Sequence, residues 1–386
     1  MANIPKRLDR KSLEAWLKSR PREDSIAIAH RAALRVFPLD DGVAESELAG
    51  ELDFTTLPML RCLIISGVPY KYFSHEIKVA ASAARLAIGA NLTNVAAHSI
   101  VSATSTTSLN TYPMNASSAA ASSVAAVDSI AFGAAASIWK QITNDLECLA
   151  RGGDPLQTPL WSDAPPDWFT AADTKTREIW AADEHPDNWA FWIKWWDAAI
   201  AGKPLNWDMQ RHVALIDDDV WKAGPGEVAK AIAGIEEKFS LLDQIAELKK
   251  QLLPVLSLGD ITSATARQRA HNHPPELIDA TASLHHYVIV ILKDLDEAEA
   301  ELEKPEPSAS VLTRIGQQLL DITARVISYC AVLSDVVLRK AAETIATTGT
   351  KWAVGIIAAD LVLPVGSFKA LADGLIEFAK AWLTKG

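Results

Sequence analysis

The chain has 386 residues, of which 49% are hydrophobic and 22% are charged, and its formal net charge is −11. This length predicts two or three domains, and the composition is that of a globular protein, which excludes the disordered and fibrous classes. The acidic balance opposes a chain-wide attraction to nucleic acid, so no nucleic-acid partner is expected.

The first segment predicts short helices with an excess of basic residues. Leu13, Trp16 and Leu17 recur at helical spacing, and Pro21 stands where a second helix would begin. The basic residues up to Arg35 favour a solvated face, with contact to an acidic lipid or partner as the alternative. No apolar signal segment is visible, which predicts a cytoplasmic protein, with peripheral contact to the inner membrane as the alternative.

Residues 86–127 contain no Asp, Glu, Lys or Arg, yet they are crowded with Ala, Ser, Thr and Asn. Residues 86–110 are too polar for a lipid-facing span, whereas residues 114–139 permit close helix packing in a soluble bundle or, as the less favoured alternative, in a membrane. Ile77, Ala81 and Ala84 begin a series at steps of three and four, which is typical of an amphipathic helix. The region therefore predicts Ala-rich helical hairpins that pack closely in water.

Most of the 13 tryptophans fall between Trp139 and Trp221. Trp189, Trp192 and Trp196 follow the spacing i, i+3 and i+7, so one short helix carries aromatic side chains over most of its circumference. We interpret this helix as a keystone between the Ala-rich bundle and the helices that follow. An aromatic cage for a base, a sugar or a cation is the alternative.

Two sets of segments carry a resemblance. The first set consists of WLKSRPRE (16–23), AALRVFP (32–38), PLW (159–161), PDW (166–168) and the tryptophan cluster at 189–196. With these, residues 10–235 resemble uncharacterised bacterial Ala-rich and Trp-rich helical proteins. The second is HNHPPE (271–276), which resembles a motif of other uncharacterised bacterial proteins ahead of a helical C-terminal region. Together they imply a fusion of two modules, and they imply no activity.

A polar, Gly-interrupted stretch at 257–270 follows a helix expected to end before Pro254. The predicted organisation is an Ala-rich and Trp-rich helical domain at 1–255, a linker at 256–282 and a C-terminal helical module at 283–386. The dense histidine group of the chain begins in this linker and extends into the start of the C-terminal module.

His271, His273, Glu276 and His285 form that group. Imidazole and carboxylate ligands suit zinc or a similar divalent metal, and the sequence indicates no other cofactor. A helix start is the favoured interpretation of the same residues, because Pro274 and Pro275 preset the backbone and Glu276 suits the positive end of the helix dipole, and metal binding is the alternative.

The C-terminal module shows a stripe that begins with Ile315, Leu319 and Ile322, and the opposite flank is apolar as well. This pattern predicts burial in a bundle, self-association or docking of a protein partner. No uninterrupted apolar span of about 20 residues occurs, so membrane contact is expected only as a conditional event. The predicted interaction surface consists of Trp352, Phe368, Phe378 and Trp382.

The sequence predicts an all-α protein without a recognisable catalytic motif: phosphate-loop, nucleophile-elbow and zinc-protease patterns are all missing. Cys62, Cys148 and Cys330 are far apart and are interpreted as reduced core residues. The favoured function is a non-catalytic interaction or adaptor protein. The alternatives are a membrane-perturbing effector of the stress or phage-defence type that acts through the C-terminal helices, and a metal-dependent enzyme that uses the histidine group.

Overall fold

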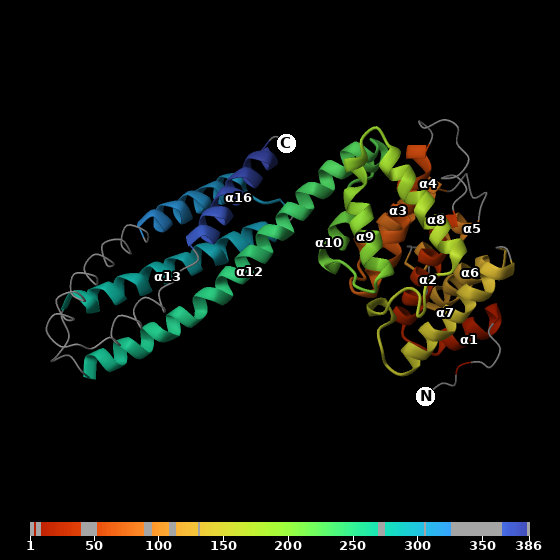
Figure 1. Ribbon diagram of the computed structural model, residues 1–386, viewed down its shortest axis with the longest axis horizontal. Coiled ribbons are helices and arrows are strands. Elements are labelled where there is room, and N and C mark those ends of the chain that lie inside the picture. Colours follow the sequence, from red (N-terminus) through yellow and green to blue (C-terminus); the bar gives the residue numbers. More distant parts are fainter. Residues whose placement is uncertain are drawn as a thin grey trace. The chain divides into compact units, whose positions relative to one another are not determined.

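The computed structural model of the protein is all-α, as the sequence predicts, and its helices are shown in Figure 1. The structure describes residues 4, 9–39, 52–88, 95–107, 113–129, 132–268, 275–304, 306–325 and 365–383, and none of these lies in a strand. Contacts divide the chain into two compact units, Met1–Ile235 and Glu236–Gly386. Each unit is described by itself below.

The division between the units falls inside α12 (Pro225–Gln268), a helix of 44 residues. It lies earlier than the boundary at 255 expected from the sequence, and residues 257–268 are helical. The helix continues through Pro254, where the sequence predicts a stop, because one proline removes a single backbone hydrogen bond and a helix of this length retains the others. Residues 269–274 of the expected linker lie outside the described part of the chain.

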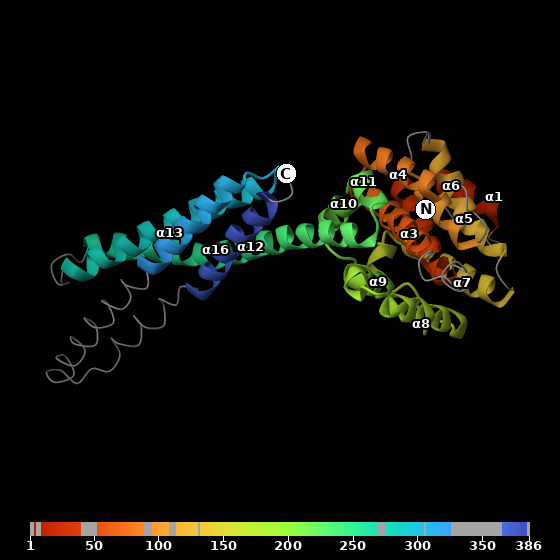
Figure 2. The same ribbon diagram turned by 90° about the horizontal axis from the view of Figure 1, so that it is seen from above.

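The first unit is organised around α2 (Arg22–Val36), which is buried from Asp24 through Val36. The helices of this unit form one cluster of short helices in both views (Figures 1 and 2), and α2 is labelled within it in Figure 1. Its neighbours are α3 (Leu52–Gly67), α5 (Val95–Ser105), α6 (Pro113–Ala125) and α7 (Phe132–Ala150), while α1 (Arg10–Lys18) packs on α6. A helix covered on this many sides needs small side chains to let its neighbours approach.

The Ala-rich helices pack closely, as predicted. Ser99 of α5 donates its hydroxyl to the Ser123 carbonyl of α6 at 2.9 Å, and the Ser123 hydroxyl is 2.9 Å from the Ser99 carbonyl. Hydroxyls on such short side chains reach a neighbouring backbone only where two helices nearly touch. Among the helices that the structure describes, none combines the length and apolar character needed to cross a bilayer.

The Trp-rich segment forms a second layer of the first unit. Its helices are α8 (Asp167–Ala182), α9 (Ala190–Ile200), α10 (Trp207–Ala214) and α11 (Asp218–Lys222). Trp192 and Trp196 are 1% and 0% exposed, and the ring of Trp196 lies 5.2 Å from that of Phe37, which directly follows α2. The predicted tryptophan cluster is thus part of the core, where it joins α9 to the central helix.

The second unit has one apolar core, built from α12, α13 (Pro275–Leu302), a helical stretch at 309–325 and α16 (Val365–Leu383). Leu241, Leu295, Leu312 and Phe368 are among its buried side chains. The turn after α13 is stabilised by Glu301, whose carboxylate accepts a hydrogen bond from the backbone N–H of Ser308 at 2.7 Å.

We expect Gly316→Val to destabilise the second unit by about 1 to 3 kcal/mol. A Cβ at Gly316 would stand 2.7 Å from Ile376 Cγ1 and 2.9 Å from the Ala372 carbonyl oxygen of α16, so the two helices would have to separate. Gly366→Val is the matched control, because a Cβ there meets nothing within 4 Å. Urea unfolding followed by circular dichroism measures both, and equal midpoints for the two variants would contradict the close approach.

Candidate functional site

The predicted metal site remains a prediction. His271 and His273 lie outside the described residues, and Glu276 and His285 lie on α13 in a part whose side chains the structure does not describe. Among the side chains that it does describe, no three His, Cys, Asp or Glu residues form a group that would hold a metal ion.

The predicted interaction residues of the C-terminal module lie largely in its core. Phe368 and Phe378 are 1% and 3% exposed, and Trp382 packs partly buried against the same core. The rings of Phe378 and Trp382 are stacked with their centroids 6.0 Å apart. Trp352 lies outside the described residues. The three described side chains therefore stabilise the second unit from within rather than forming an exposed surface.

The cysteines differ in their surroundings. Cys62 is buried, and burial raises the pKa of its thiol to about 12, which keeps it protonated at neutral pH. Cys148 is only half-buried, in contrast to the core position predicted for it, and Cys330 lies outside the described residues.

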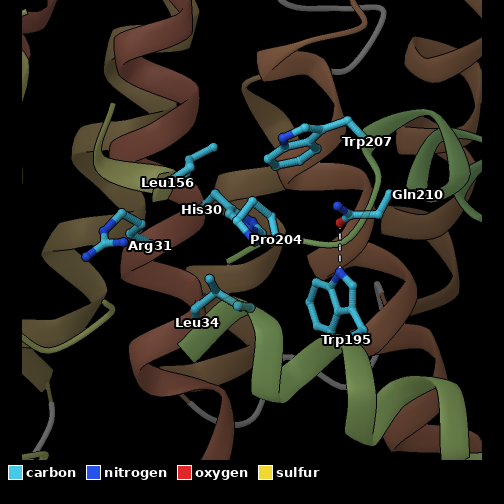
Figure 3. A pocket seen from close by; sticks show the side chains of 9 residues that line it. His30, Arg31, Leu34, Leu156, Trp195, Pro204, Trp207 and Gln210 are labelled. Atoms are coloured by element: carbon cyan, nitrogen blue, oxygen red, sulfur yellow. Dashed lines mark hydrogen bonds between the residues drawn. The ribbon is translucent and has the colours of Figure 1, made fainter. Parts of the chain in front are cut away.

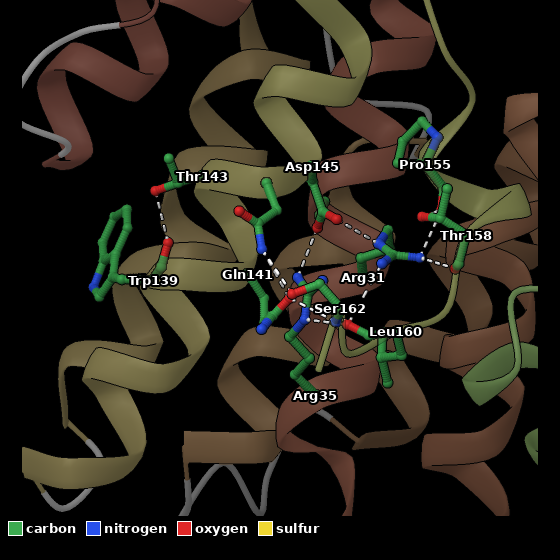
Figure 4. A network of polar contacts seen from close by, with 12 residues as sticks. Arg31, Arg35, Trp139, Gln141, Thr143, Asp145, Pro155, Thr158, Leu160 and Ser162 are labelled. Atoms are coloured by element: carbon green, nitrogen blue, oxygen red, sulfur yellow. Dashed lines mark hydrogen bonds and ion pairs between the residues drawn. The ribbon is translucent and has the colours of Figure 1, made fainter. Parts of the chain in front are cut away.

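A buried ionic cluster joins α2 to α7 (Figure 4). Arg31 Nε donates to Asp145 Oδ1 at 2.9 Å, and Arg35 Nη1 donates to Asp145 Oδ2 at 2.7 Å. The side chains of Arg31, Arg35 and Asp145 are 3%, 0% and 4% exposed. The prediction of a solvated basic face is therefore wrong for these two arginines, because both are buried and share Asp145 as their ion-pair partner.

The same two arginines bind the loop that follows α7. Arg31 donates to the carbonyls of Pro155 at 2.6 Å, Thr158 at 2.9 Å and Pro159 at 2.8 Å, and Arg35 donates to the carbonyl of Leu160 at 2.9 Å. Two guanidinium groups face a single carboxylate, and the carbonyl oxygens supply the remaining acceptors. The cluster thereby fastens the start of the Trp-rich segment to α2. The sequence held one signal for it: two arginines four residues apart in an otherwise Ala-rich helix.

A small cavity lies beside this cluster, where α2, α9 and α10 meet (Figure 3). His30, Trp195, Trp207 and Gln210 are among its lining residues, and its free volume is about 20 Å³. This volume is enough for about one water molecule and far below that of a pocket for an organic ligand. The amide of Gln210 is already bonded, since it accepts from Trp195 Nε1 at 2.8 Å and donates to the Leu205 carbonyl at 2.8 Å.

His30 should make the stability of the first unit depend on pH. Its ring nitrogen Nδ1 lies 2.8 Å from the Ser66 hydroxyl, and burial lowers its pKa to about 3. An unfolded histidine has a pKa of about 6.5. Between about pH 6.5 and about pH 3, the unfolded chain therefore binds a proton at His30 that the folded chain does not bind. This contribution to stability is present above about pH 6.5 and is lost as the pH falls.

We therefore expect His30→Asn, which keeps a polar group near Ser66, to lose less stability than the wild type on acidification. The difference should reach about 2 kcal/mol between about pH 7 and about pH 5. Denaturant unfolding of both proteins at a series of pH values measures this difference. If the free energy of unfolding depends on pH in the same way for both proteins, His30 takes up a proton in the folded state.

The exposed large apolar side chains of the first unit lie within one short stretch of the chain, from residue 72 to residue 86. Tyr72, Phe73, Val79 and Leu86 are 37%, 40%, 45% and 82% exposed. Among the described residues of this unit, no other large hydrophobic side chain is as exposed as these four. Tyr72 and Phe73 follow η3 (Val68–Tyr70), and the other two lie on α4 (His75–Ile88). We call these four residues the α4 face.

Cations surround the aromatic end of the α4 face. The Arg22 guanidinium carbon lies 3.8 Å and the Lys78 Nζ 4.6 Å from the centroid of the Phe73 ring, and Arg211 lies 5.3 Å from that of Tyr72. These contacts hold the positive charges beside the exposed rings. The spacing of Ile77, Ala81 and Ala84 predicts the buried stripe of α4. The exposed stripe has only two apolar residues, so in sequence it resembles ordinary surface.

Comparison of the chain with protein-family models, with curated proteins and with solved structures found no match.

Proposed function

We propose that the protein is a helical interaction protein of the adaptor type, which binds another protein through the α4 face. The observation that carries this proposal is the exposure of Tyr72, Phe73, Val79 and Leu86 on α4 and on the turn that precedes it. Soluble proteins scatter single apolar residues over their surfaces, whereas a group of them surrounded by polar residues is typical of an interaction site.

The composition of the α4 face fits this class. Tyrosine, phenylalanine and arginine are favoured at protein interfaces, since aromatic rings bury a large area and guanidinium groups bond in defined directions. Tyr72, Phe73, Arg22 and Arg211 bring these groups together here. The chain also has a second compact unit with its own core, which leaves a separate surface for a second contact, as an adaptor requires.

Site-specific cross-linking of the full chain in its source cells tests the proposal. A photoreactive residue at position 86 should give a discrete adduct with another protein, and the same residue at position 253 is the control, because Leu253 is 58% exposed in the second unit. Leu86→Glu should abolish co-purification of that protein. A full-length chain that purifies from these cells without any stoichiometric partner would contradict the proposal.

A further inference from the structure

We infer that the α4 face binds an amphipathic helix of a partner protein, with the acidic residues of that helix at the end next to Arg22 and Lys78. This inference rests on the proposed function and specifies the partner's chemistry. It follows from the spacing of the exposed apolar residues, from the charges at one end of the face and from the way those charges are held.

The exposed residues of α4 have the spacing of a helix–helix seam. Val79 and Leu86 are seven residues apart, which returns to the same side of a helix after two turns and about 10 Å. Between them lie Ser82 and Ala83, both small and half-buried. Small side chains between two larger ones let a second helix approach closely and seat its own apolar residues between Val79 and Leu86.

Arg22 and Lys78 lie at the end of this seam next to Phe73, whereas Arg85, beside Leu86 at the other end, already has contacts of its own. Neither Arg22 nor Lys78 forms an ion pair with a residue that the structure describes. By contrast, Arg211 is paired with Asp208 at 2.7 Å, and Lys71 lies 3.7 Å from Asp154.

The acidic residues nearest to the two available cations along the chain are Glu23 and Glu76. Both glutamates are exposed, and among the described residues neither forms an ion pair with Arg22 or Lys78. Acidic groups of a partner would therefore find two positive charges that no carboxylate of the described chain already binds.

Arg22 is held in place before any partner arrives. Its Nη2 donates to the carbonyl of Thr106, and its guanidinium lies over Phe73. Fixing a guanidinium in advance lowers the entropic cost of binding and favours a carboxylate at a defined position. A lipid bilayer does not need such fixed positions.

Two further observations favour a protein helix over a bilayer. The net charge of −11 repels an extended anionic surface more than a short acidic segment. Tyr72 and Phe73 are only 37% and 40% exposed, so they do not project as far as side chains that insert between lipid headgroups must.

Synthetic peptides test the inference on the full-length protein. The first probe is a helical peptide of about 21 residues with leucine at the two apolar positions of each heptad and glutamate beside them, and the second replaces every glutamate with lysine. Fluorescence anisotropy should show binding of the acidic peptide and at least about tenfold weaker binding of the basic one. Added salt should weaken the acidic complex.

Variants locate the binding. Leu86→Glu and Val79→Glu should each lower the affinity for the acidic peptide by about tenfold or more. Lys78→Gln should reduce the preference for the acidic peptide over the basic one. The matched control is Leu253→Glu, an exposed leucine of the second unit at which affinity should not change.

The inference is overturned if neither peptide binds, if both bind equally, or if Leu86→Glu leaves the affinity unchanged. It is also overturned by Leu86-dependent binding to vesicles of phosphatidylglycerol and phosphatidylcholine, or by Leu86-dependent dimerisation in light scattering, without peptide binding. If a cellular partner still binds the Leu86→Glu variant, this inference is wrong, but the protein still has an interaction function. If the acidic peptide binds but the protein has no cellular partner, the proposed function is wrong, while the preference of the α4 face for an acidic helix remains.

Discussion

Asp145→Asn should destabilise the first unit by about 3 to 5 kcal/mol, the typical cost of removing one partner from a buried ionic cluster. The asparagine keeps the shape of the side chain but removes the single carboxylate that faces Arg31 and Arg35, which are 3% and 0% exposed. Both guanidinium groups would stay charged and buried, with only carbonyl oxygens as acceptors. The loss should also loosen the loop at 155–160, since its carbonyls are bound by the same arginines.

Asp163→Asn is the matched control for this prediction. Asp163 pairs with Lys140 at 2.8 Å, but the two side chains are 65% and 66% exposed. Water screens such a pair, so the change should cost less than about 1 kcal/mol. Guanidinium chloride unfolding monitored by tryptophan fluorescence measures both variants. Similar midpoints for Asp145→Asn and Asp163→Asn would show that the buried ionic cluster does not contribute the expected free energy of unfolding.

Trp196→Ala should cost about 3 to 5 kcal/mol, because it removes a large aromatic side chain from a fully buried position. Trp196 is 0% exposed and lies 5.2 Å, centroid to centroid, from Phe37. Its indole N–H donates to Asp173 Oδ1 at 2.7 Å, so the truncation also deprives that carboxylate of a donor. The cavity left behind would separate α9 from the end of α2.

Trp168→Ala provides the comparison for Trp196. Trp168 is half-buried, although it too contacts an aromatic neighbour and donates its N–H, to the Ser137 hydroxyl at 3.2 Å. A smaller loss of stability is expected there, since less area leaves the core. Denaturant unfolding followed by far-ultraviolet circular dichroism avoids the change in fluorescence that each variant causes. An unchanged midpoint for Trp196→Ala would instead make this residue part of a recognition surface.

Regular patterns in the sequence determined the helical class and several individual elements. Ile77, Ala81 and Ala84 predict the buried stripe of α4, and all three are buried. Trp189, Trp192 and Trp196 predict a helix with aromatic side chains on several sides, and the structure buries each of them. Such features follow from spacing along the chain alone, because a helix returns to the same side every three to four residues.

Tertiary structure alone decided the charged core, the extent of α12 and the candidate site. Arg31 and Arg35 look like surface residues in sequence, and they are buried only because Asp145 is brought to them from 114 and 110 positions away. Pro254 favours a helix end, but the helix continues on both sides of it. The exposure of Leu86 likewise depends on which side of α4 the bundle covers. Spacing shows which side chains share a face of a helix, whereas contacts between distant segments decide which face meets water and which charge finds a partner.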